Sequence, residues 1–416
     1  TSVLLAAHLR LALQSCLRCS PFGCLHSTQH LKKPTPDNSL QPNGCLMKVL
    51  QVLPGLNSGG VEKGTLEIAQ ALVQAGHDST VLSAGGRLVD PLEKDGSRHV
   101  TWDIGRKSLS MLFQVRKIRR WLSHEQFDVV HVRSRMPAWV IWLAWRKMPL
   151  ATRPRLVSTM HGLHSVNRYS EIMTCGERVI VVSKSVDQYI KDNYPRADHN
   201  KLRLIYRGID PVDFPYGYQA DASWKQAFFE QYPSLENSLI VTLPGRMTRL
   251  KGHLGFIAII NNLKRSGVNV KGLVIGGEDP KRKGYAEEVY KTVAEYNLED
   301  DIIFVGHRSD MKELYSISNV ILSLSTKPES FGRTVLEPLS MGVPVVGHNH
   351  GGVGEILTAL FPDGAAELNN IKDIQEKVTA ILQGQSQPVT ENKLFLLSEM
   401  KEKTLALYES LIQEKR

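Results

Sequence analysis

The chain repeats one arrangement of residues in its two halves, and this repeat limits the folds open to it more than any other feature. Residues 48–72 read KVLQVLPGLNSGGVEKGTLEIAQAL, and residues 238–263 read SLIVTLPGRMTRLKGHLGFIAIINNL. Each segment holds an apolar run, the tripeptide Leu-Pro-Gly, a loop with glycine and lysine, and then a helical pattern. A buried strand that leads into a helix is the building unit of a parallel sheet, so the repeat predicts two sheets of one kind.

Short apolar runs rich in β-branched residues alternate with longer amphipathic segments through the rest of the chain. Such runs are typical of parallel strands that are buried on both faces. The first half has runs at 48–54, 78–84, 127–133, 155–162, 178–183 and 201–208. The second half has runs at 238–245, 272–277, 302–307, 320–325 and 343–348.

The segment 60–76 shows the helical pattern most clearly. Leu66, Ala69, Leu72 and Val73 fall on one face of the predicted helix, and Gly76 provides its C-terminal stop. Together with the strands, such helices predict an α/β protein made of two facing Rossmann-like doubly wound domains, with an interdomain cleft. Ligands of such sheets bind at the carboxyl ends of the strands, so the cleft is the expected site.

The predicted domains follow from the repeat and from one irregular segment. Residues 210–223, DPVDFPYGYQADAS, contain proline, glycine and aspartate without a clear period, which favours a boundary there. We therefore expect one Rossmann-like domain over 47–215 and a second over 216–390. A closing helix is expected within 391–416, and residues 1–46 are expected to lie outside the fold.

Residues 1–46 differ in composition from the rest of the chain. They contain one acidic residue, Asp37, several basic residues and four of the five cysteines. Three interpretations fit them: a secretory signal whose apolar stretch is interrupted by His8 and Arg10, an organellar transit peptide, or an extension translated upstream of the natural start. We favour the extension, because Met47 immediately precedes the first strand. Only Cys175 follows this segment, so a disulfide framework is excluded from the globular part and a reducing cytoplasm is expected.

The charge of the chain is concentrated in its first half. The 416 residues are 42% hydrophobic and 22% charged, a normal globular balance, with a net charge of +9. Residues 48–215 hold 25 Lys+Arg against 16 Asp+Glu, and the excess of 25 − 16 = 9 equals the whole-chain value. This asymmetry predicts that the first half meets an anionic partner. No uninterrupted apolar stretch is long enough to span a membrane.

Two loops that follow first strands carry candidate anion-binding residues. Gly59 and Gly60 precede a helix, where backbone N–H groups can approach an anion closely, although a flexible loop explains the same residues. Arg246 and Lys251 bracket the matching loop of the second half, and two cations beside a helix N-terminus can neutralise a diphosphate; a solvated basic loop is the alternative. Neither loop contains a dinucleotide-binding G-x-G-x-x-G fingerprint or a P-loop, and the chain has no Asp-x-Asp motif for a divalent metal.

Two further segments end strands at the expected cleft. His161 follows the run that begins at residue 155, and it is either a ligand contact or a structural histidine. Residues 328–346, PESFGRTVLEPLSMGVPVV, carry Glu329 before a turn and Glu337 on the helix that follows it. If both were helical they would lie ~12 Å apart along the axis. A retaining hydrolase needs its two carboxylates about 5 Å apart, so these two are better suited to bind two separate diols.

Taken together, these motifs resemble family 4 of the glycosyltransferases, also called group 1, which has the GT-B fold. The resemblance covers residues 48–385, and the segment 394–413, LFLLSEMKEKTLALYESLIQ, is similar to the closing helix of such enzymes. It implies retaining, metal-independent transfer of a sugar from a nucleotide diphosphate sugar to an acceptor hydroxyl, with no cofactor. The catalytic residues implied are His161, Glu329, Arg246 and Lys251. The donor-binding residues implied are Gly59, Gly60, Arg246, Lys251, Glu329, Ser330, Phe331, Gly332 and Glu337.

The resemblance also implies that residues 47–215 form an acceptor-side domain and residues 216–390 a nucleotide-sugar-binding domain. It implies a role for each site residue as well. Arg246 and Lys251 hold the diphosphate as the glycosidic bond breaks, and His161 and Glu329 contact the transferred sugar. Glu337 binds the ribose diol, and Gly60 lets the backbone approach the donor phosphate or the acceptor. Ser330, Phe331 and Gly332 turn the chain so that the next backbone N–H groups point toward the donor phosphate.

The acceptor is expected to be a lipopolysaccharide-like or other glycolipid, or a carbohydrate, on the strength of the resemblance. The segment 107–126 has an apolar stripe, with Arg116, Lys117, Arg119 and Arg120 beside it. It is either an ordinary domain helix or a surface that contacts anionic lipid, and Arg133, Arg135, Arg153, Arg155 and Arg168 add bases that line the acceptor side in this interpretation. We expect a cytoplasmic protein, peripheral at the inner membrane face, that binds no nucleic acid.

Two other functions remain open from the sequence. One is another GT-B activity, such as a sugar-nucleotide epimerase or a glycosyl phosphorylase; a phosphorylase would need a lysine-bound pyridoxal cofactor, for which the sequence gives no signal. The other is a non-catalytic protein that binds anions or a membrane through its basic half. Replacement of Glu337 separates the latter from an enzyme, because it would abolish donor turnover and leave a pure anion binder unchanged.

Overall fold

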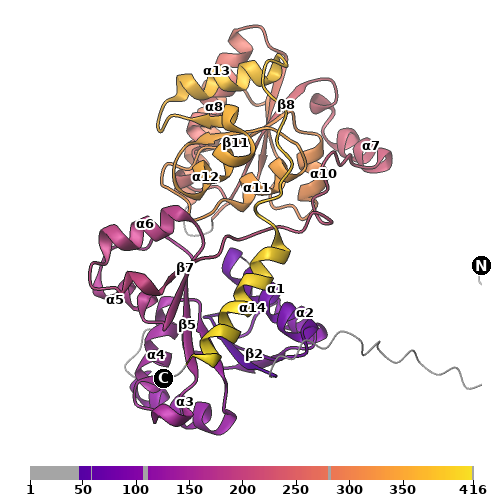
Figure 1. Ribbon diagram of the computed structural model, residues 1–416. Coiled ribbons are helices and arrows are strands. Elements are labelled where there is room, and N and C mark those ends of the chain that lie inside the picture. The colour runs from indigo at the N-terminus through magenta and orange to yellow at the C-terminus, as the bar shows by residue number, and fades with distance from the viewer. Residues whose placement is uncertain (1–45, 58, 106–110, 280–282, 415–416) are drawn as a thin grey trace, which may run out of the picture. The chain divides into compact units, whose positions relative to one another are not determined.

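The structure is a computed structural model that describes residues 46–57, 59–105, 111–279 and 283–414 (Figure 1). Within this part of the chain, seven strands form one parallel sheet and six form another. The strand order is β3-β2-β1-β4-β5-β6-β7 in the first sheet and β10-β9-β8-β11-β12-β13 in the second. The first six strands of each sheet therefore follow one order, and β1 and β8, the two strands of the sequence repeat, hold the same place. The predicted fold class is confirmed.

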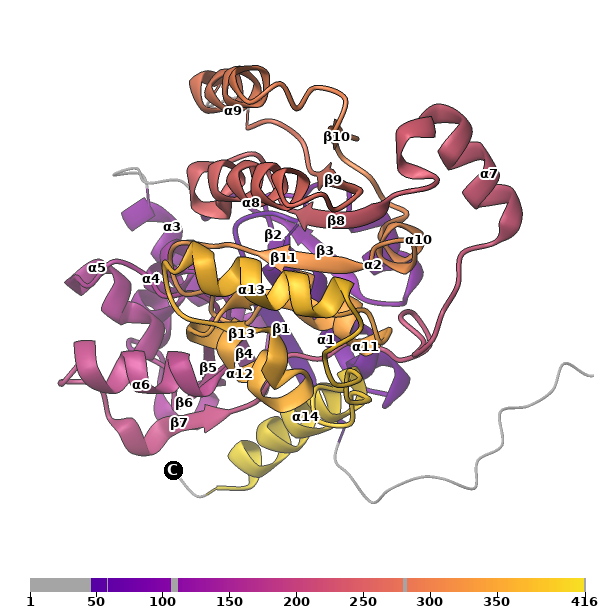
Figure 2. The ribbon, with the colours of Figure 1, turned by 90° about the horizontal axis from the view of Figure 1, so that it is seen from above.

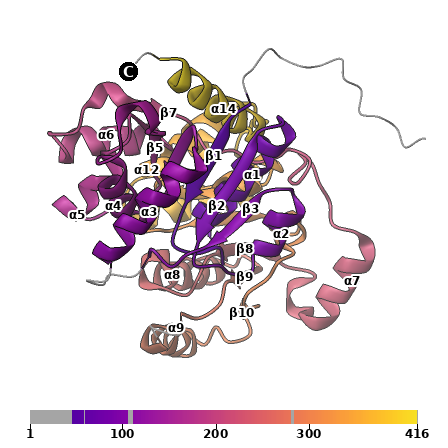
Figure 3. The same cartoon turned by 90° about the horizontal axis from the view of Figure 1, so that it is seen from below.

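The first half of the chain alternates strands and helices as the sequence predicts. Its strands are β1 (Lys48–Val52), β2 (Asp78–Ser83), β3 (Arg98–Thr101), β4 (Val129–Val132), β5 (Arg155–Met160), β6 (Arg178–Val181) and β7 (Leu202–Leu204). Its helices are α1 (Gly60–Gln74), α2 (Val89–Lys94), α3 (Met111–Glu125), α4 (Arg135–Trp145), α5 (Arg168–Glu171) and α6 (Lys184–Asn193). Short 3₁₀ turns lie at Leu150–Thr152, Ile172–Thr174 and His199–Lys201. Helices α3 and α4 lie side by side (Figure 3).

The second half has the same alternation around its own sheet. Its strands are β8 (Leu239–Pro244), β9 (Val270–Ile275), β10 (Ile302–Phe304), β11 (Val320–Ser323), β12 (Val345–His348) and β13 (Ala365–Ala366). Its helices are α7 (Ala222–Gln231), α8 (His253–Arg265), α9 (Lys283–Glu295), α10 (Met311–Ser316), α11 (Arg333–Ser340), α12 (Gly351–Leu360), α13 (Ile371–Leu382) and α14 (Leu397–Gln413). Further 3₁₀ turns lie at Pro233–Leu235, Arg249–Lys251 and Pro362–Gly364. Helices α8 and α13 lie side by side against the second sheet (Figure 2).

The structure differs from the predicted strands in three places. β7 was expected to be buried on both faces, but Arg203 and Leu204 are exposed because β7 is the edge strand of its sheet. β3 and β13 were not predicted. β3 (RHVT) contains only one aliphatic residue, and β13 has only two residues, so neither produces a run that the sequence pattern can detect.

Helix α1 begins and ends where the sequence predicts, but its buried face is displaced. Its last turn closes at Ala75, and Gly76 has a φ of 81°, the left-handed conformation that favours glycine after a helix. Ala69 and Leu72 are buried as expected, and Ile68 is buried with them. Leu66 and Val73, which were expected on this face, are only partly buried.

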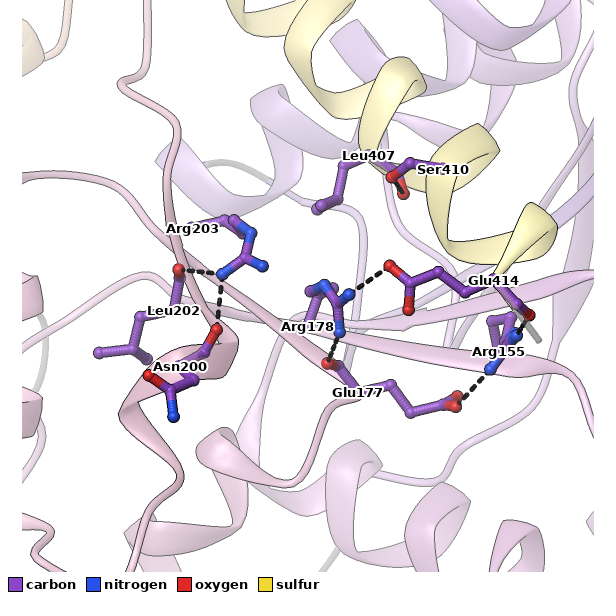
Figure 4. A network of polar contacts seen from close by, with 9 residues as sticks. All are labelled: Arg155, Glu177, Arg178, Asn200, Leu202, Arg203, Leu407, Ser410 and Glu414. Atoms are coloured by element: carbon purple, nitrogen blue, oxygen red, sulfur yellow. Dashed lines mark hydrogen bonds and ion pairs between the residues drawn. The ribbon is translucent and has the colours of Figure 1, made fainter. Parts of the chain in front are cut away.

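Helix α14 returns from the second half to pack against the first sheet, beside α1 (Figure 1). Its apolar side chains join a cluster with residues of β1, α1 and β4. At its end, the backbone carbonyl of Glu414 accepts from Arg155, and the Glu414 carboxylate pairs with Arg178 (Figure 4). Arg155 also pairs with Glu177 at 3.0 Å, so the buried Arg155 and the partly buried Arg178 hold the end of α14 to the sheet.

The predicted domain boundaries stay predictions. Two helices nevertheless lie in the segments from which the boundaries were predicted. The segment 210–223 contains the start of α7, and α14 falls within 391–416. The predicted extension 1–46 lies outside the described residues except for Leu46, and so do Cys16, Cys19, Cys24 and Cys45. Cys175 is a free thiol. Among the residues that the structure describes, no helix is both long and apolar enough to cross a membrane.

A buried hydrogen bond attaches α14 to the centre of the first sheet, and its loss should destabilise the fold. The Tyr408 hydroxyl lies 2.6 Å from Nδ1 of His131 on β4, and the Thr159 hydroxyl lies 2.6 Å from Nε2 of the same ring. Tyr408→Phe leaves Nδ1 of His131 unpaired in the core, so we expect the free energy of unfolding to fall by about 1–3 kcal/mol. Urea unfolding followed by tryptophan fluorescence measures the change.

The matched control is Tyr296→Phe, because Tyr296 is 46% exposed. It should change the free energy of unfolding by less than about 0.5 kcal/mol, as is usual for surface substitutions. Equal effects of the two substitutions would contradict the role given to the Tyr408 hydroxyl.

Candidate functional site

The candidate residues lie where strands of the two sheets end. Gly59 and Gly60 follow β1, and Lys251 follows β8, so both loops leave the strands at which the strand order reverses. His161 follows the last residue of β5, and Glu329 lies in the segment after β11. In open parallel sheets, loops at such positions form the ligand site.

Hydrogen bonds and ion pairs bring most of these residues together. The Ser330 hydroxyl donates to the backbone carbonyl of His161 at 2.6 Å, which joins the second half to the end of β5. Lys251 Nζ lies 2.5 Å from Oε1 of Glu329. The sequence placed these four residues in one site, and the structure gathers them there.

The Lys251–Glu329 ion pair is the best-defined polar contact of the site. Both side chains are about four-fifths buried, and Glu329 also accepts from the Ser325 hydroxyl. Burial opposes ionisation of Glu329, but the ion pair with Lys251 and the hydrogen bonds outweigh it and hold the pKa of Glu329 below its ordinary value. Glu329 is therefore an ionised hydrogen-bond acceptor at neutral pH.

Two glycines shape the loop that carries Lys251. Gly252 has a φ of 76°, and a Cβ there would lie 2.5 Å from the carbonyl oxygen of Leu324. Gly245 has a φ of 146°, and a Cβ there would lie 3.2 Å from Cδ of Lys251. The loop can therefore pack against the end of β11 and lay the lysine stem over Gly245 only because both positions lack a side chain. Arg246 lies on the same loop, and its side chain is exposed.

The segment after β11 is held against the start of α12. The backbone N–H of Gly352 donates to the carbonyl of Glu329 at 2.8 Å, and a Cβ on Gly351 would lie 2.5 Å from the same oxygen. Gly332, which precedes α11, has a φ of 112°. Phe331 is buried and contacts Phe395, so it can offer a ligand its backbone but not its ring. Glu329 is thus fixed on a tightly packed turn.

Glu337 belongs to an ion-pair network that the sequence did not predict. Arg333, four residues earlier on α11, lies 3.2 Å from Glu337 and 3.1 Å from Glu67 of α1. The Tyr315 hydroxyl donates to the other Glu337 oxygen at 3.4 Å. Burial lowers the pKa of Arg333, but the two carboxylates raise it above its ordinary value, so the arginine stays charged. The i,i+4 spacing of Arg333 and Glu337 was visible in the sequence, whereas Glu67 was not.

A second buried arginine, Arg207, connects the first glycine loop to His161. It donates to the backbone carbonyl of Gly60 and, at 2.9 Å, to Nδ1 of His161. Burial, and then the positive charge of Arg207, depress the pKa of His161 well below its ordinary value. Nε2 of His161 is buried and has no hydrogen-bond partner among the described residues. Arg207 was missed because the sequence shows only an isolated arginine at the end of an apolar run.

Two of the bases assigned to the acceptor side are in fact internal. Arg133 is 5% exposed and donates to Gln51 at 2.9 Å, and Arg155 is 8% exposed and holds the end of α14. The prediction for Arg155 was wrong, because charge alone does not reveal that this residue is buried against α14. Arg133 is buried but lines a small cavity with His161, so its place on the acceptor side stays a prediction. On α3, Arg116, Lys117 and Arg120 are exposed, opposite the buried Ile118 and Leu122. Of the predicted segment 107–126, residues 107–110 and the side chains of Met111 and Leu112 lie outside the part of the chain that the structure describes.

The arrangement suits the binding of a charged ligand better than acid–base catalysis. Glu329 is ionised and His161 is neutral, so neither is poised to exchange a proton near pH 7. Lys251 and the backbone N–H groups at the start of α11 can meet an anion. Within the described ranges, no group of three or more His, Cys, Asp or Glu residues is arranged to hold a metal ion.

Comparisons with known proteins identify relatives across most of the chain. Residues 58–213 match a model described as Glycosyltransferase Family 4, and residues 225–393 match a model described as Glycosyl transferases group 1. Spore coat protein SA of Bacillus subtilis is 23% identical over 310 residues, which cover 72% of this chain and 78% of that protein.

Solved structures share the fold over nearly the whole described chain. A glycosyltransferase from Rickettsia africae has a TM-score of 0.74 and 29% identity, and covers 89% of this chain and 100% of its own. HepE from Anabaena, solved with UDP and glucose, has a TM-score of 0.73 and 19% identity, and covers 88% of this chain and 100% of its own. At 19% identity, the likeness to HepE supports a shared fold and not a shared function.

The Lys251–Glu329 pair should make stability depend on pH. Because the folded pKa of Glu329 is lowered, its contribution is present above the ordinary glutamate pKa of about 4.3 and is lost as the pH falls through the folded value. Lys251→Met should therefore lower the free energy of unfolding by about 2 kcal/mol at pH 7, the size of a lost hydrogen bond to a charged group, and by less at pH 3. Urea unfolding at pH 7, 5 and 3 measures this difference.

Lys372→Met is the matched control, because Lys372 is 86% exposed and its ion pair with Glu376 is long, at 3.7 Å. It should have almost no effect at any pH. A destabilisation by Lys251→Met that stays the same from pH 7 to pH 3 would contradict the charged pair.

Proposed function

We propose that this chain, which belongs to the group 1 glycosyltransferases (glycosyltransferase family 4), transfers a sugar from a nucleotide diphosphate sugar to an acceptor hydroxyl with retention at the anomeric carbon and without a metal ion. The observation that carries the proposal is the buried pair of Lys251 and Glu329. Glu329 lies on the segment that Ser330 joins to His161. This arrangement offers a cation, a carboxylate and an imidazole at the strand ends, which are the groups that a charged sugar donor requires.

The diphosphate of the donor is assigned to the second half. Lys251 and Arg246 supply positive charge on one loop, and Gly332 opens α11, whose first backbone N–H groups add partial positive charge. As the glycosidic bond breaks, negative charge grows on the departing diphosphate, and cations and N–H groups that are already in place stabilise it. This supports catalysis without a metal, because the chain itself supplies the counter-charge.

The hydroxyl groups of the donor are assigned to the two glutamates. Glu329 is an ionised acceptor held by Lys251 and Ser325, so it can bind hydroxyls of the transferred sugar. Glu337 is held by Arg333 and Tyr315, which orient its carboxylate for the ribose diol. The two carboxylates therefore act as separate hydrogen-bond acceptors for one donor.

The bond changes follow from these positions. The acceptor hydroxyl oxygen bonds to the anomeric carbon, and the bond from that carbon to the diphosphate oxygen breaks with its electron pair leaving on the diphosphate. The proton of the acceptor hydroxyl passes to the departing diphosphate. No protein base is needed in this scheme. This agrees with a neutral His161 and with an ionised Glu329 whose carboxylate already accepts from Lys251 and Ser325.

The acceptor is assigned to the first half, and we propose a glycolipid at an anionic membrane surface. Arg116, Lys117 and Arg120 form an exposed basic face on α3. On the same half, Arg146 stacks on Trp142, 4.5 Å from the centre of its ring. Basic and aromatic side chains are suited to the headgroup region of an anionic membrane, so they can bring the first half to a lipid-linked acceptor.

Replacement of Glu337 tests the donor site. Glu337→Ala removes the carboxylate assigned to the ribose and leaves Arg333 paired with Glu67, so the fold should persist. We expect kcat/KM for the donor to fall by about 10²-fold, the effect of losing a charged hydrogen bond. Nucleotide release is measured with a panel of UDP-, GDP-, ADP- and CMP-sugars, which also identifies the donor.

Glu376→Ala, on an exposed helix face of the second half, is the matched control and should leave turnover unchanged. Absence of binding and of release with every donor of the panel would overturn the proposed activity. Such a protein would instead fit a non-catalytic anion binder.

The basic face of α3 should control membrane binding. We expect the chain to sediment with vesicles that contain anionic lipid at low salt and to be released at high salt. The triple replacement of Arg116, Lys117 and Arg120 by Gln should weaken binding about tenfold or more, because each cation near the surface contributes about 1 kcal/mol. The control replaces the exposed Lys291, Lys372 and Lys393 of the second half. No binding of the unmodified chain at low salt would refute the membrane proposal.

A further inference from the structure

Arg207 occupies an unusual position for an arginine. It lies in the segment just after β7, is 7% exposed, and extends its guanidinium between the start of α1 and the end of β5. There it donates to the backbone carbonyl of Gly60 and, through Nη2, to Nδ1 of His161 at 2.9 Å. One side chain therefore contacts both first-half loops that the proposed function uses.

The helix α1 makes room for this guanidinium at Gly64. A Cβ at Gly64 would lie 2.8 Å from Nη1, 2.9 Å from Nη2 and 3.1 Å from Cζ of Arg207. Real Cβ atoms do not come this close to neighbouring groups, so any side chain would displace the guanidinium. Glycine is unfavourable inside a helix, and the close approach of Arg207 explains its presence.

The contact with Arg207 decides which nitrogen of His161 carries a proton. A guanidinium has only donors, so Nδ1 of His161 must accept and cannot hold a proton. A neutral imidazole then carries its single proton on Nε2. Burial lowers the pKa of Arg207 to about 10, so the guanidinium stays charged at neutral pH.

The groups around His161 all favour its neutral form. Arg207 approaches from the segment after β7, His131 lies on β4 with Arg133 directly after it, and His164 lies beyond β5. After burial itself, each of these groups lowers the pKa of His161. From the second half, the contact with this residue is the Ser330 hydroxyl, which binds the backbone carbonyl and not the ring.

We propose that Arg207 is a positioning residue that fixes His161 as a neutral imidazole with its proton on Nε2, so that His161 meets the donor sugar as a hydrogen-bond donor and not as an acid or a base. The part of this inference that concerns the sugar rests on the proposed function, whereas the tautomer does not. Nε2 is buried without a partner among the described residues, and His161 lines a small cavity of about 20 Å³ with Gly64, Arg133 and Arg207. An oxygen acceptor of the sugar satisfies that N–H.

Nitrogen NMR of the full chain tests the tautomer directly. The protein is prepared with ¹⁵N-labelled histidine, and proton–nitrogen correlation spectra are recorded from pH 5.5 to 8. The signals of His161, one of 14 histidines, are assigned by their loss in His161→Gln. We expect a protonated Nε2 and an unprotonated Nδ1 whose shifts do not change over this range.

Two substitutions should release His161 by different routes. Arg207→Met removes the donor and its charge, so Nδ1 is free to carry the proton and the His161 signals should shift toward a mixture of the two neutral tautomers, while burial and Arg133 still hold the pKa of His161 below its ordinary value. Gly64→Ala keeps both residues but displaces the guanidinium, and should move the His161 signals in the same direction. Arg203→Met is the matched control: Arg203 is exposed on β7 and donates to the backbone carbonyls of Asn200 and Leu202 (Figure 4).

The proposal is overturned if His161 of the unmodified chain titrates near pH 6.5 or carries its proton on Nδ1. It is also overturned if its signals are the same in Arg207→Met as in the unmodified chain.

Kinetics with the donor found by the panel supply a second measurement. Because Arg207 orients a group that contacts the reacting sugar, Arg207→Met should lower kcat about tenfold or more and change the donor KM less than threefold. Arg207→Lys, which keeps a cation and a donor, should recover part of the lost kcat; no difference from Arg207→Met would overturn the positioning role. If His161 has the expected tautomer but the chain turns over no donor, the proposed function is overturned. The role of Arg207 in fixing the tautomer is still supported in that case.

Discussion

Parallel pairing of the strands is the constraint on which the rest of the structure depends. Parallel neighbours must be joined by a crossover, so all strands of one sheet end at the same edge. β1 and β8 lie where the strand order reverses, and the loops after them are free to hold a ligand. Gly59 and Lys251 are in such loops, while His161 and Glu329 follow the ends of β5 and β11. The sheets thus gather residues from distant parts of the sequence.

The second constraint is the presence of several charged groups in a poorly solvated region. A buried charge is costly unless it is paired and hydrogen-bonded. Lys251 pairs with Glu329, and Arg333 pairs with both Glu67 and Glu337. Once paired, these side chains are fixed, and a fixed carboxylate or cation does not have to reorganise when a ligand arrives. The pairs therefore cost desolvation energy but provide an oriented site.

The sequence predicted the fold and the local parts of this site for a clear reason. The period of the apolar runs reports strands and helices directly, and Glu329, Gly332 and Glu337 lie within one short segment whose turn and helix are locally encoded. The contacts that complete the site are not local: 266 residues separate Arg333 from Glu67, and 147 separate Arg207 from Gly60. No pattern in one sequence reports such pairs. For the same reason the sequence does not reveal that Arg133 and Arg155 are buried, since only their neighbours in space show it.

Polar contacts join the two halves of the site, and they affect how a donor binds. Ser330 bonds to the carbonyl of His161, and Arg333 pairs with Glu67. Near the start of α6, Glu355 of α12 accepts from the backbone N–H and the hydroxyl of Ser185 at 2.7 and 2.6 Å. Each hydrogen bond contributes only about 0.5–1.5 kcal/mol net, because water can replace either partner. A ligand that contacts Lys251 on one half and His161 on the other adds interactions of similar size. The affinity for such a ligand is therefore tied directly to how the two halves meet, and residues such as Arg207 that fix one side before binding reduce the ordering that the ligand must supply.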